Sequence, residues 1–229
     1  MTLQDYEHAM SVMFWGAVYP TLAVLPQMLA RHSGRIVNIT SISGKVSVPH
    51  LLPYSCAKFA AVGFSEGLRA ELAREGITVT TIVPGLMRTG SHLNALFKGH
   101  QEREYALFAP SASLPFISMD AERAARQIVR AITRGEAERV LTIPATVLAR
   151  FHGLFPGTTA NLLSVVGRML PPPDGTVRPV ARGMEIQGRK RFPILRVLTR
   201  WGLSAAQRYH QYPGPGSDLA GARPAEGAA

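Results

Sequence analysis

Tyr54 and Lys58 stand four residues apart in a stretch whose pattern predicts a helix over residues 54–74. At this spacing both side chains lie on one helical face, one turn apart. A tyrosine has a pKa near ~10 in water, so alone it exchanges protons poorly at neutral pH. A fixed ammonium close by favours the phenolate and lowers that pKa. The pair is suited to general acid–base catalysis, although a core tyrosine beside a snorkelling lysine would show the same spacing.

Two further segments are expected near this pair. Ser41 directly follows the β-branched stretch 35–40, and the loop 83–89 follows a second β-rich stretch, residues 77–83. In open α/β sheets, ligands bind outside the carboxyl ends of the strands. We therefore expect Ser41, the tyrosine–lysine pair and this loop to meet at one rim of a sheet.

The elements that must position these groups alternate along the chain. Helical patterns cover residues 2–31, 54–74 and 121–134, and strand patterns cover 35–40, 77–83 and 139–143. Pro20 should kink the first helix or remove one of its hydrogen bonds, while Asp120 and Gly135 bound the last helix. This alternation predicts parallel strands joined by helical crossovers, which is an α/β domain.

Three motifs resemble those of the short-chain dehydrogenase/reductase family in order and spacing: the serine strand 34–44, the Tyr54–Lys58 pair, and the loop from Pro84-Gly85 to Thr89. The resemblance extends over about residues 5–145. It implies a Rossmann-like, doubly wound parallel sheet. It also implies an oxidoreductase that transfers hydride between NAD or NADP and a carbonyl or secondary alcohol.

The resemblance also implies a role for each residue. Tyr54 would exchange a proton with the substrate oxygen, Ser41 would hydrogen-bond that oxygen, and Lys58 would contact the nicotinamide ribose and lower the pKa of Tyr54. The implied cofactor-binding residues are Tyr54, Lys58, Pro84, Gly85 and Thr89. Where Met13 stands, the family usually has an asparagine, so proton exchange with solvent would need another route.

A larger departure concerns the nucleotide-binding half of the family's domain. No Gly-x-x-x-Gly-x-Gly turn occurs in the sequence, so the expected fold is the C-terminal half of such a domain, with a long unpaired sheet edge. We expect the isolated chain to be inactive. The alternatives are a misassigned start or gene fragment, a non-catalytic fragment that docks on a partner or membrane, and a genuine half-domain enzyme.

Composition narrows the class of protein. The 229 residues are 46% apolar and 17% charged, which is ordinary for a globular protein and excludes disordered, collagen-like and disulfide-scaffolded chains. The single cysteine, Cys56, cannot form an internal bridge and is interpreted as a packing residue in a reducing, cytoplasmic location. No uninterrupted run of 18 apolar residues occurs, so no membrane-spanning helix is expected.

The net charge of +10 is concentrated near the C-terminus, because residues 174–209 hold eight basic and two acidic residues. Such an arm attracts phosphates of an anionic membrane or of nucleic acid, or is simply a solvated extension. No aromatic-interleaved, base-reading motif accompanies it, so no nucleic-acid partner is expected. The histidines show no metal-ligand spacing, and no metal is expected.

We divide the chain into a truncated Rossmann-like domain (1–145), a helical, basic extension (146–212) and a disordered tail (213–229). The extension reads as apolar but broken stretches. Its apolar residues could cover a hydrophobic small-molecule substrate, lie on a bilayer surface or pack into a core. By resemblance, the chain is also expected to form homo-oligomers.

Overall fold

The computed structural model describes residues 1–172, 180–189 and 193–211. It divides into two compact units, each described below by itself. The first comprises Met1–Met87 with Pro115–Gly175, and the second comprises Arg88–Leu114 with Thr176–Ala229.

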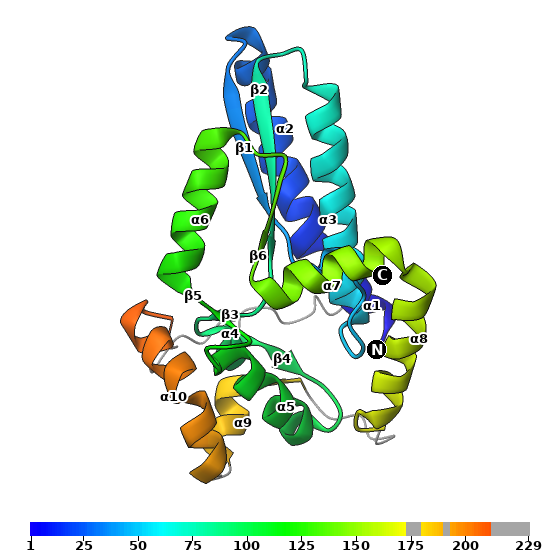
Figure 1. The fold of residues 1–229 in the computed structure, drawn as a ribbon, viewed down its shortest axis with the longest axis vertical. Coiled ribbons are helices and arrows are strands. Elements are labelled where there is room, and N and C mark those ends of the chain that lie inside the picture. The colour runs from blue at the N-terminus through cyan, green and yellow to red at the C-terminus, as the bar shows by residue number, and fades with distance from the viewer. Residues whose placement is uncertain (173–179, 190–192, 212–229) are drawn as a thin grey trace, which may run out of the picture. The chain divides into compact units, whose positions relative to one another are not determined.

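The first unit is built on a parallel sheet with the strand order β1-β2-β6 (Figure 1). Its strands are β1 (Gly34–Ile39), β2 (Ile77–Pro84) and β6 (Glu138–Leu141). β1 runs parallel to β2 with Gly34 opposite Ile77, and β2 runs parallel to β6 with Thr81 opposite Glu138. The predicted α/β fold with parallel strands is therefore confirmed.

Helices cover both faces of this sheet (Figure 1). On one face, α2 (Gly16–Ala30) and α3 (Leu52–Glu71) pack against β1 and β2. On the other face lies α6 (Ala121–Arg134). Alternate strand residues supply the two cores, because successive side chains point to opposite faces. The core under α3 contains Ile36, Leu68, Leu72, Ile77 and Val79, and the core under α6 contains Ile82, Ala124, Ala131 and Leu141.

The limits of α6 follow the local signals in the sequence. The Asp120 carboxylate accepts hydrogen bonds from the backbone N–H groups of Glu122 and Arg123, at 3.1 and 3.2 Å. Gly135 ends the helix in the left-handed conformation, with φ at 63°. Both predicted boundary residues are confirmed. Two short strands, β3 (Met87–Arg88) and β5 (Met119–Asp120), lie in the segments between β2 and α6.

The N-terminal helical stretch is continuous from Leu3 to Ala30. It consists of α1 (Leu3–Ala9), a π-helical segment (Met10–Trp15) that contains Met13, and α2, which continues through Pro20. By length and composition alone, this stretch would be able to cross a membrane, and only 17% of its most apolar window is buried. Core helices pass the same test, and Leu25, Met28 and Leu29 of α2 pack into the core.

Two helices follow β6, namely α7 (Ile143–Leu154) and α8 (Pro156–Met169). The segment was expected to be helical with broken apolar stretches, and Pro144 and Pro156 stand in the first turns of its two helices, where proline is favoured. The structure also groups residues 146–172 with the first unit rather than with a C-terminal extension. The reason is that α7 packs directly against β6 and buries Ala145.

The second unit is mostly helical. Its elements are α4 (Ser91–Asn94), β4 (Leu96–Phe97), α5 (Gln101–Ser113), β7 (Ala181–Arg182), α9 (Gly183–Arg189) and α10 (Pro193–Arg208). β4 pairs antiparallel with β7, and the core contains Tyr105, Ala109, Ala181 and Ile186. The predicted disordered tail, 213–229, and the basic residues Lys190 and Arg191 lie outside the described residues.

Candidate active site

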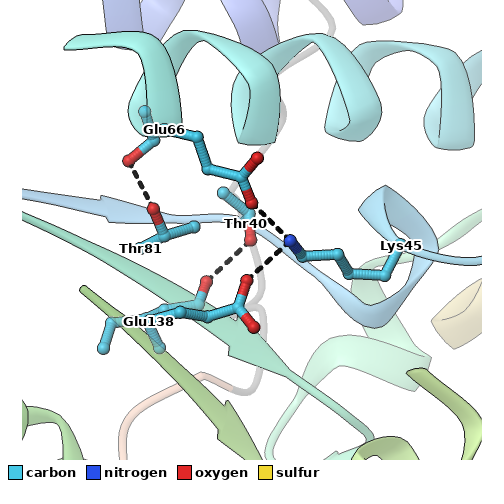
Figure 2. Close-up of polar contacts among 7 residues, drawn as sticks. Thr40, Lys45, Glu66, Thr81 and Glu138 are labelled. Carbon is cyan, nitrogen blue, oxygen red and sulfur yellow. Dashed lines mark hydrogen bonds and ion pairs between the residues drawn. The ribbon is translucent and has the colours of Figure 1, made fainter. Parts of the chain in front are cut away.

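Ser41 is buried where the chain leaves β1. The preceding residue, Thr40, ties this strand end to β2, since both its N–H and its hydroxyl donate to the Ile82 carbonyl oxygen, at 2.8 and 2.7 Å (Figure 2). Ser41 caps a 3-10 turn, Ile42–Gly44, and its Oγ accepts a hydrogen bond from the Ser43 N–H at 3.2 Å. The serine hydroxyl therefore has a fixed position and keeps its own proton for another partner.

That partner is Tyr54, in the first turn of α3. The side chains of Ser41 and Tyr54 are hydrogen-bonded to each other, although 13 residues separate them. Burial raises the pKa of Tyr54, and the hydrogen bond with Ser41 acts in the opposite direction by lowering it. A serine O–H that donates to the phenol oxygen stabilises the phenolate, which explains the sign of its effect.

Lys58 lies one turn beyond Tyr54 on α3. Its Nζ donates to the Ile39 carbonyl oxygen at 3.3 Å and lies 5.8 Å from the centroid of the Tyr54 ring. Burial lowers the pKa of the Lys58 ammonium. The expected lowering of the Tyr54 pKa by Lys58 stays a prediction, because burial and Ser41 are the causes that act on Tyr54 in the structure.

A buried polar network fixes α3 against the strands. Asn38 of β1 and Thr81 of β2 are opposite each other, and both donate to the Ser65 Oγ of α3, at 3.0 and 2.7 Å. Figure 2 shows Thr81 in this contact. Buried hydrogen bonds of this kind have strong directional preferences and are costly to break. The network therefore holds the helix that carries Tyr54 and Lys58 in register with the strand that leads to Ser41.

Salt bridges also hold the Ser41 turn itself. Lys45, just after the turn, is paired with Glu66 of α3 and with Glu138 of β6, the latter at 2.6 Å (Figure 2). Burial lowers the pKa of the Lys45 ammonium, but the bonds to the two carboxylates outweigh this effect, so the pKa is raised. One ammonium thus joins the turn, the helix and the third strand.

The loop after β2 begins beside this turn, because β1 and β2 are parallel neighbours and end at the same edge. Pro84 is buried at the end of β2, and the Gly85 N–H donates to the Leu141 carbonyl oxygen at 3.0 Å. A β-carbon on Gly85 would come within 2.3 Å of the Thr142 Oγ1, so the close packing requires glycine. Thr89 belongs to the second unit, where its Oγ1 accepts from the Ser91 N–H at 3.2 Å.

Sequence reasoning missed Ser65, Gly44 and Lys45 as residues that position the site. The available signal for Ser65 was its place on the small-residue face of α3, four residues after Ala61 and eight after Ala57. The expectation for Cys56 was wrong, since its side chain is exposed. It stands two residues after Tyr54, and therefore on the opposite side of the helix.

β1 forms an edge of the sheet, since among the described residues it pairs only with β2. Beside it lies an open groove of about 410 Å³, lined by residues of α2 and by residues 35–39 of β1. Ile39, at the end of this groove, is 50% exposed. The groove thus runs along the open edge of the strand that leads to Ser41.

Comparisons with known proteins agree with this geometry. Residues 1–96 match the family model described as short chain dehydrogenase. The SadH protein of Mycobacterium tuberculosis, named as an oxidoreductase, is 37% identical over 155 residues, which cover 66% of this chain and 55% of SadH. A dehydrogenase/reductase SDR family protein 7-like of Anopheles gambiae is 48% identical over 87 residues, covering 38% of this chain and 27% of that protein. Over residues 1–96 the chain thus matches the short-chain dehydrogenase/reductase family, and it spans about half the length of SadH.

Solved structures share the fold. A short-chain dehydrogenase from Streptomyces avermitilis aligns with a TM-score of 0.57 and 25% identity, over 73% of this chain and 64% of that one. A gluconate 5-dehydrogenase from Burkholderia cenocepacia, solved with NADP and tartrate, aligns with a TM-score of 0.52 and 20% identity, over 64% of this chain and 58% of its own.

Proposed function

We propose that this chain carries the proton-transfer residues of an NAD(P)-dependent oxidoreductase that interconverts a carbonyl compound and a secondary alcohol. The observation that supports this most directly is the hydrogen bond between Ser41 and Tyr54, with Lys58 one helical turn further on. These groups meet at the carboxyl end of a parallel strand, where α/β enzymes bind their ligands.

In this proposal Tyr54 gives its proton to the carbonyl oxygen during reduction and takes it back during oxidation. Ser41 donates a hydrogen bond to the same oxygen and so fixes its distance from the phenol. The nicotinamide supplies or accepts the hydride when the cofactor is bound. Lys58 uses one of its three N–H donors on Ile39, which leaves two for the hydroxyls of the ribose.

The residues present fit the nicotinamide ribose but offer no glycine-rich turn for the pyrophosphate. We therefore propose that the 229-residue chain alone turns over little substrate. SadH, which is named as an oxidoreductase, supports the reaction class. The proposal also includes NAD or NADP as the cofactor, a cytoplasmic location and a homo-oligomeric state.

The test compares the 229-residue chain with a chain extended upstream in frame, each incubated with NADH or NADPH and a panel of aldehydes and ketones. We expect turnover in the extended form and its loss in Tyr54→Phe. The control is Tyr19→Phe, because Tyr19 is 64% exposed on α2. Turnover by Tyr54→Phe equal to that of the control would contradict the assignment of Tyr54.

One observation favours a second candidate, a non-catalytic protein that binds a partner through β1. The groove beside β1 offers a strand edge and apolar lining residues, such as Val24 and Met28 of α2. An extended peptide adds to such an edge through main-chain hydrogen bonds. This candidate predicts that neither form of the chain oxidises NADH or NADPH, and that Val37 and Ile39 amides gain protection from hydrogen exchange when a partner binds.

A further inference from the structure

The surface of α8 carries an exposed apolar stripe. Four of its side chains are exposed although they are aliphatic or thioether groups: Leu162 (55%), Val165 (53%), Val166 (45%) and Met169 (82%). They follow the spacing i, i+3, i+4, i+7, so they lie on one face of the helix. We call these four residues the α8 stripe. Only Thr159 of α8 is buried, so this helix contributes little to the core of its unit.

An exposed aromatic pair lies at the N-terminal end of α8. Phe151 of α7 and Phe155 at the start of α8 have ring centroids 5.4 Å apart, and they are 36% and 52% exposed. Leu154, between them in the sequence, is 74% exposed. Contiguous exposed apolar groups of this kind mark an interaction surface, whereas isolated ones do not.

The charged residues next to the stripe in the sequence are all basic. No aspartate or glutamate occurs between Glu138 and Asp174, whereas Arg150 and Arg168 lie in α7 and α8. Arg168 stands three residues after Val165, and Arg150 stands four residues before Leu154, so each guanidinium is a surface neighbour of an exposed apolar side chain. Both arginines are exposed.

The exposed apolar stripe and the neighbouring arginines together favour one kind of partner over another. A second copy would bring a second set of arginines to the same surface, and each chain has a net charge of +10. Like charges that meet in this way oppose association. An anionic lipid surface offers apolar chains for the stripe and negative headgroups for the arginines, and long arginine side chains reach from apolar surface to headgroups.

We propose that the α8 stripe and the neighbouring aromatic pair form a docking surface for an anionic phospholipid bilayer. The helix lies along the interface, with the stripe among the acyl chains and Arg168 among the phosphates. None of these residues is Ser41, Tyr54 or Lys58, and the proposal does not depend on the redox reaction.

The test is flotation of the full chain with vesicles of phosphatidylcholine, alone or mixed with phosphatidylglycerol. We expect the chain to float with the mixed vesicles, and high salt to reduce the bound fraction because it screens the headgroups. Leu162→Glu combined with Val166→Glu should lower the bound fraction by about tenfold. The matched control is Val129→Glu, because Val129 is a 58% exposed valine on α6 and should leave flotation unchanged.

Two further variants keep the test decisive. Met169→Glu, at the last and most exposed residue of the stripe, should also reduce flotation, and circular dichroism reports whether each variant is folded. Arg150→Gln with Arg168→Gln should weaken binding to the mixed vesicles only. The proposal is overturned if the wild-type chain does not float with either vesicle, if folded stripe variants float like the wild type, or if they change self-association in sedimentation velocity instead.

Discussion

Gly44 and Lys58 are in direct backbone contact, since a β-carbon on Gly44 would lie 2.6 Å from the Lys58 carbonyl oxygen. Gly44 closes the turn that begins at Ser41, and Lys58 follows Tyr54 by one turn of α3. The distance between the serine and the tyrosine thus depends on a glycine that has no catalytic chemistry of its own. The same β-carbon would also meet Val62, at 2.9 Å, so the crowding cannot be relieved by one rotamer change.

Gly44→Ala should therefore push the Ser41 turn away from α3. We expect a loss of about 1–3 kcal/mol in the free energy of unfolding, as for other overpacked sites. Denaturant titration measures this loss. Gly63→Ala is the matched control, because Gly63 is also on α3 but has nothing within 4 Å of its added β-carbon. It should stabilise the protein by about 1 kcal/mol, since alanine is the better helix former. Equal effects of the two substitutions would show that the contact with Lys58 is unimportant.

Ser41→Ala should raise the pKa of Tyr54 further, because it removes the hydrogen bond that opposes the effect of burial. An NMR titration of ring-labelled tyrosine measures this, and Tyr54→Phe assigns the resonance. Burial raises the pKa of Tyr54 in the folded state above 10.0. Its contribution to the free energy of unfolding is therefore present below pH 10.0 and is lost as the pH rises through the folded-state pKa. Ser47→Ala, at an exposed serine beyond the turn, should leave the resonance unchanged.

The ion pairs of Lys45 with Glu66 and Glu138 should be measurable by double-mutant cycles. Lys45→Met with Glu138→Gln should give a coupling energy of about 0.5–1 kcal/mol, and the cycle with Glu66 should give less, because Glu66 is 53% exposed and its pair is screened by water. The reference is the Arg126–Glu122 pair of α6, which is longer at 3.6 Å and more exposed. A coupling energy for Lys45 no larger than that of this reference would argue against its role in holding the Ser41 turn.

His92 makes the second unit sensitive to acid. Its side chain is completely buried, and burial lowers its pKa below 6.5, with a smaller opposing effect of the Thr89 backbone. The unfolded chain then binds the proton more readily, so stability falls as the pH drops below 6.5, by at most about 1.4 kcal/mol per pH unit. In His92→Phe, which keeps a ring beside Tyr105, unfolding curves should depend less on pH in this range than in His8→Gln. Identical pH dependence in both variants would contradict this.

Local signals predicted the parts of the fold that local interactions determine. Asp120 and Gly135 bound α6 as expected, because a cap and a left-handed glycine act on their own helix ends. The parallel sheet followed from the alternation of elements, which restricts the possible topologies. Residues after Pro144 were expected to form a helical extension of broken apolar stretches, whereas the structure has two helices that begin near Pro144 and Pro156.

The site was predictable as a set of residue types but not as an arrangement. The spacing of Tyr54 and Lys58 is a property of one helix, whereas Ser65 meets Asn38 and Thr81 from 27 and 16 residues away. Contacts of that kind depend on the packing of α3 across two strands; the periodicity of small residues marks the face of α3 that holds Ser65 but does not identify its partners. The contact of Gly44 with α3 was missed for the same reason.

The one-sided pairing of β1 has a consequence for the behaviour of its peptide groups in deuterated water. The Thr40 N–H points to β2, where it donates to Ile82, so the amides of Ile36 and Asn38 share that direction by the two-residue repeat of a strand. The amides of Arg35, Val37 and Ile39 then face outward, and they should exchange fast while their neighbours exchange slowly. Such an alternation of fast and slow exchange along six consecutive residues would show that β1 has no partner strand on this side. It would disappear when another strand pairs with β1 there.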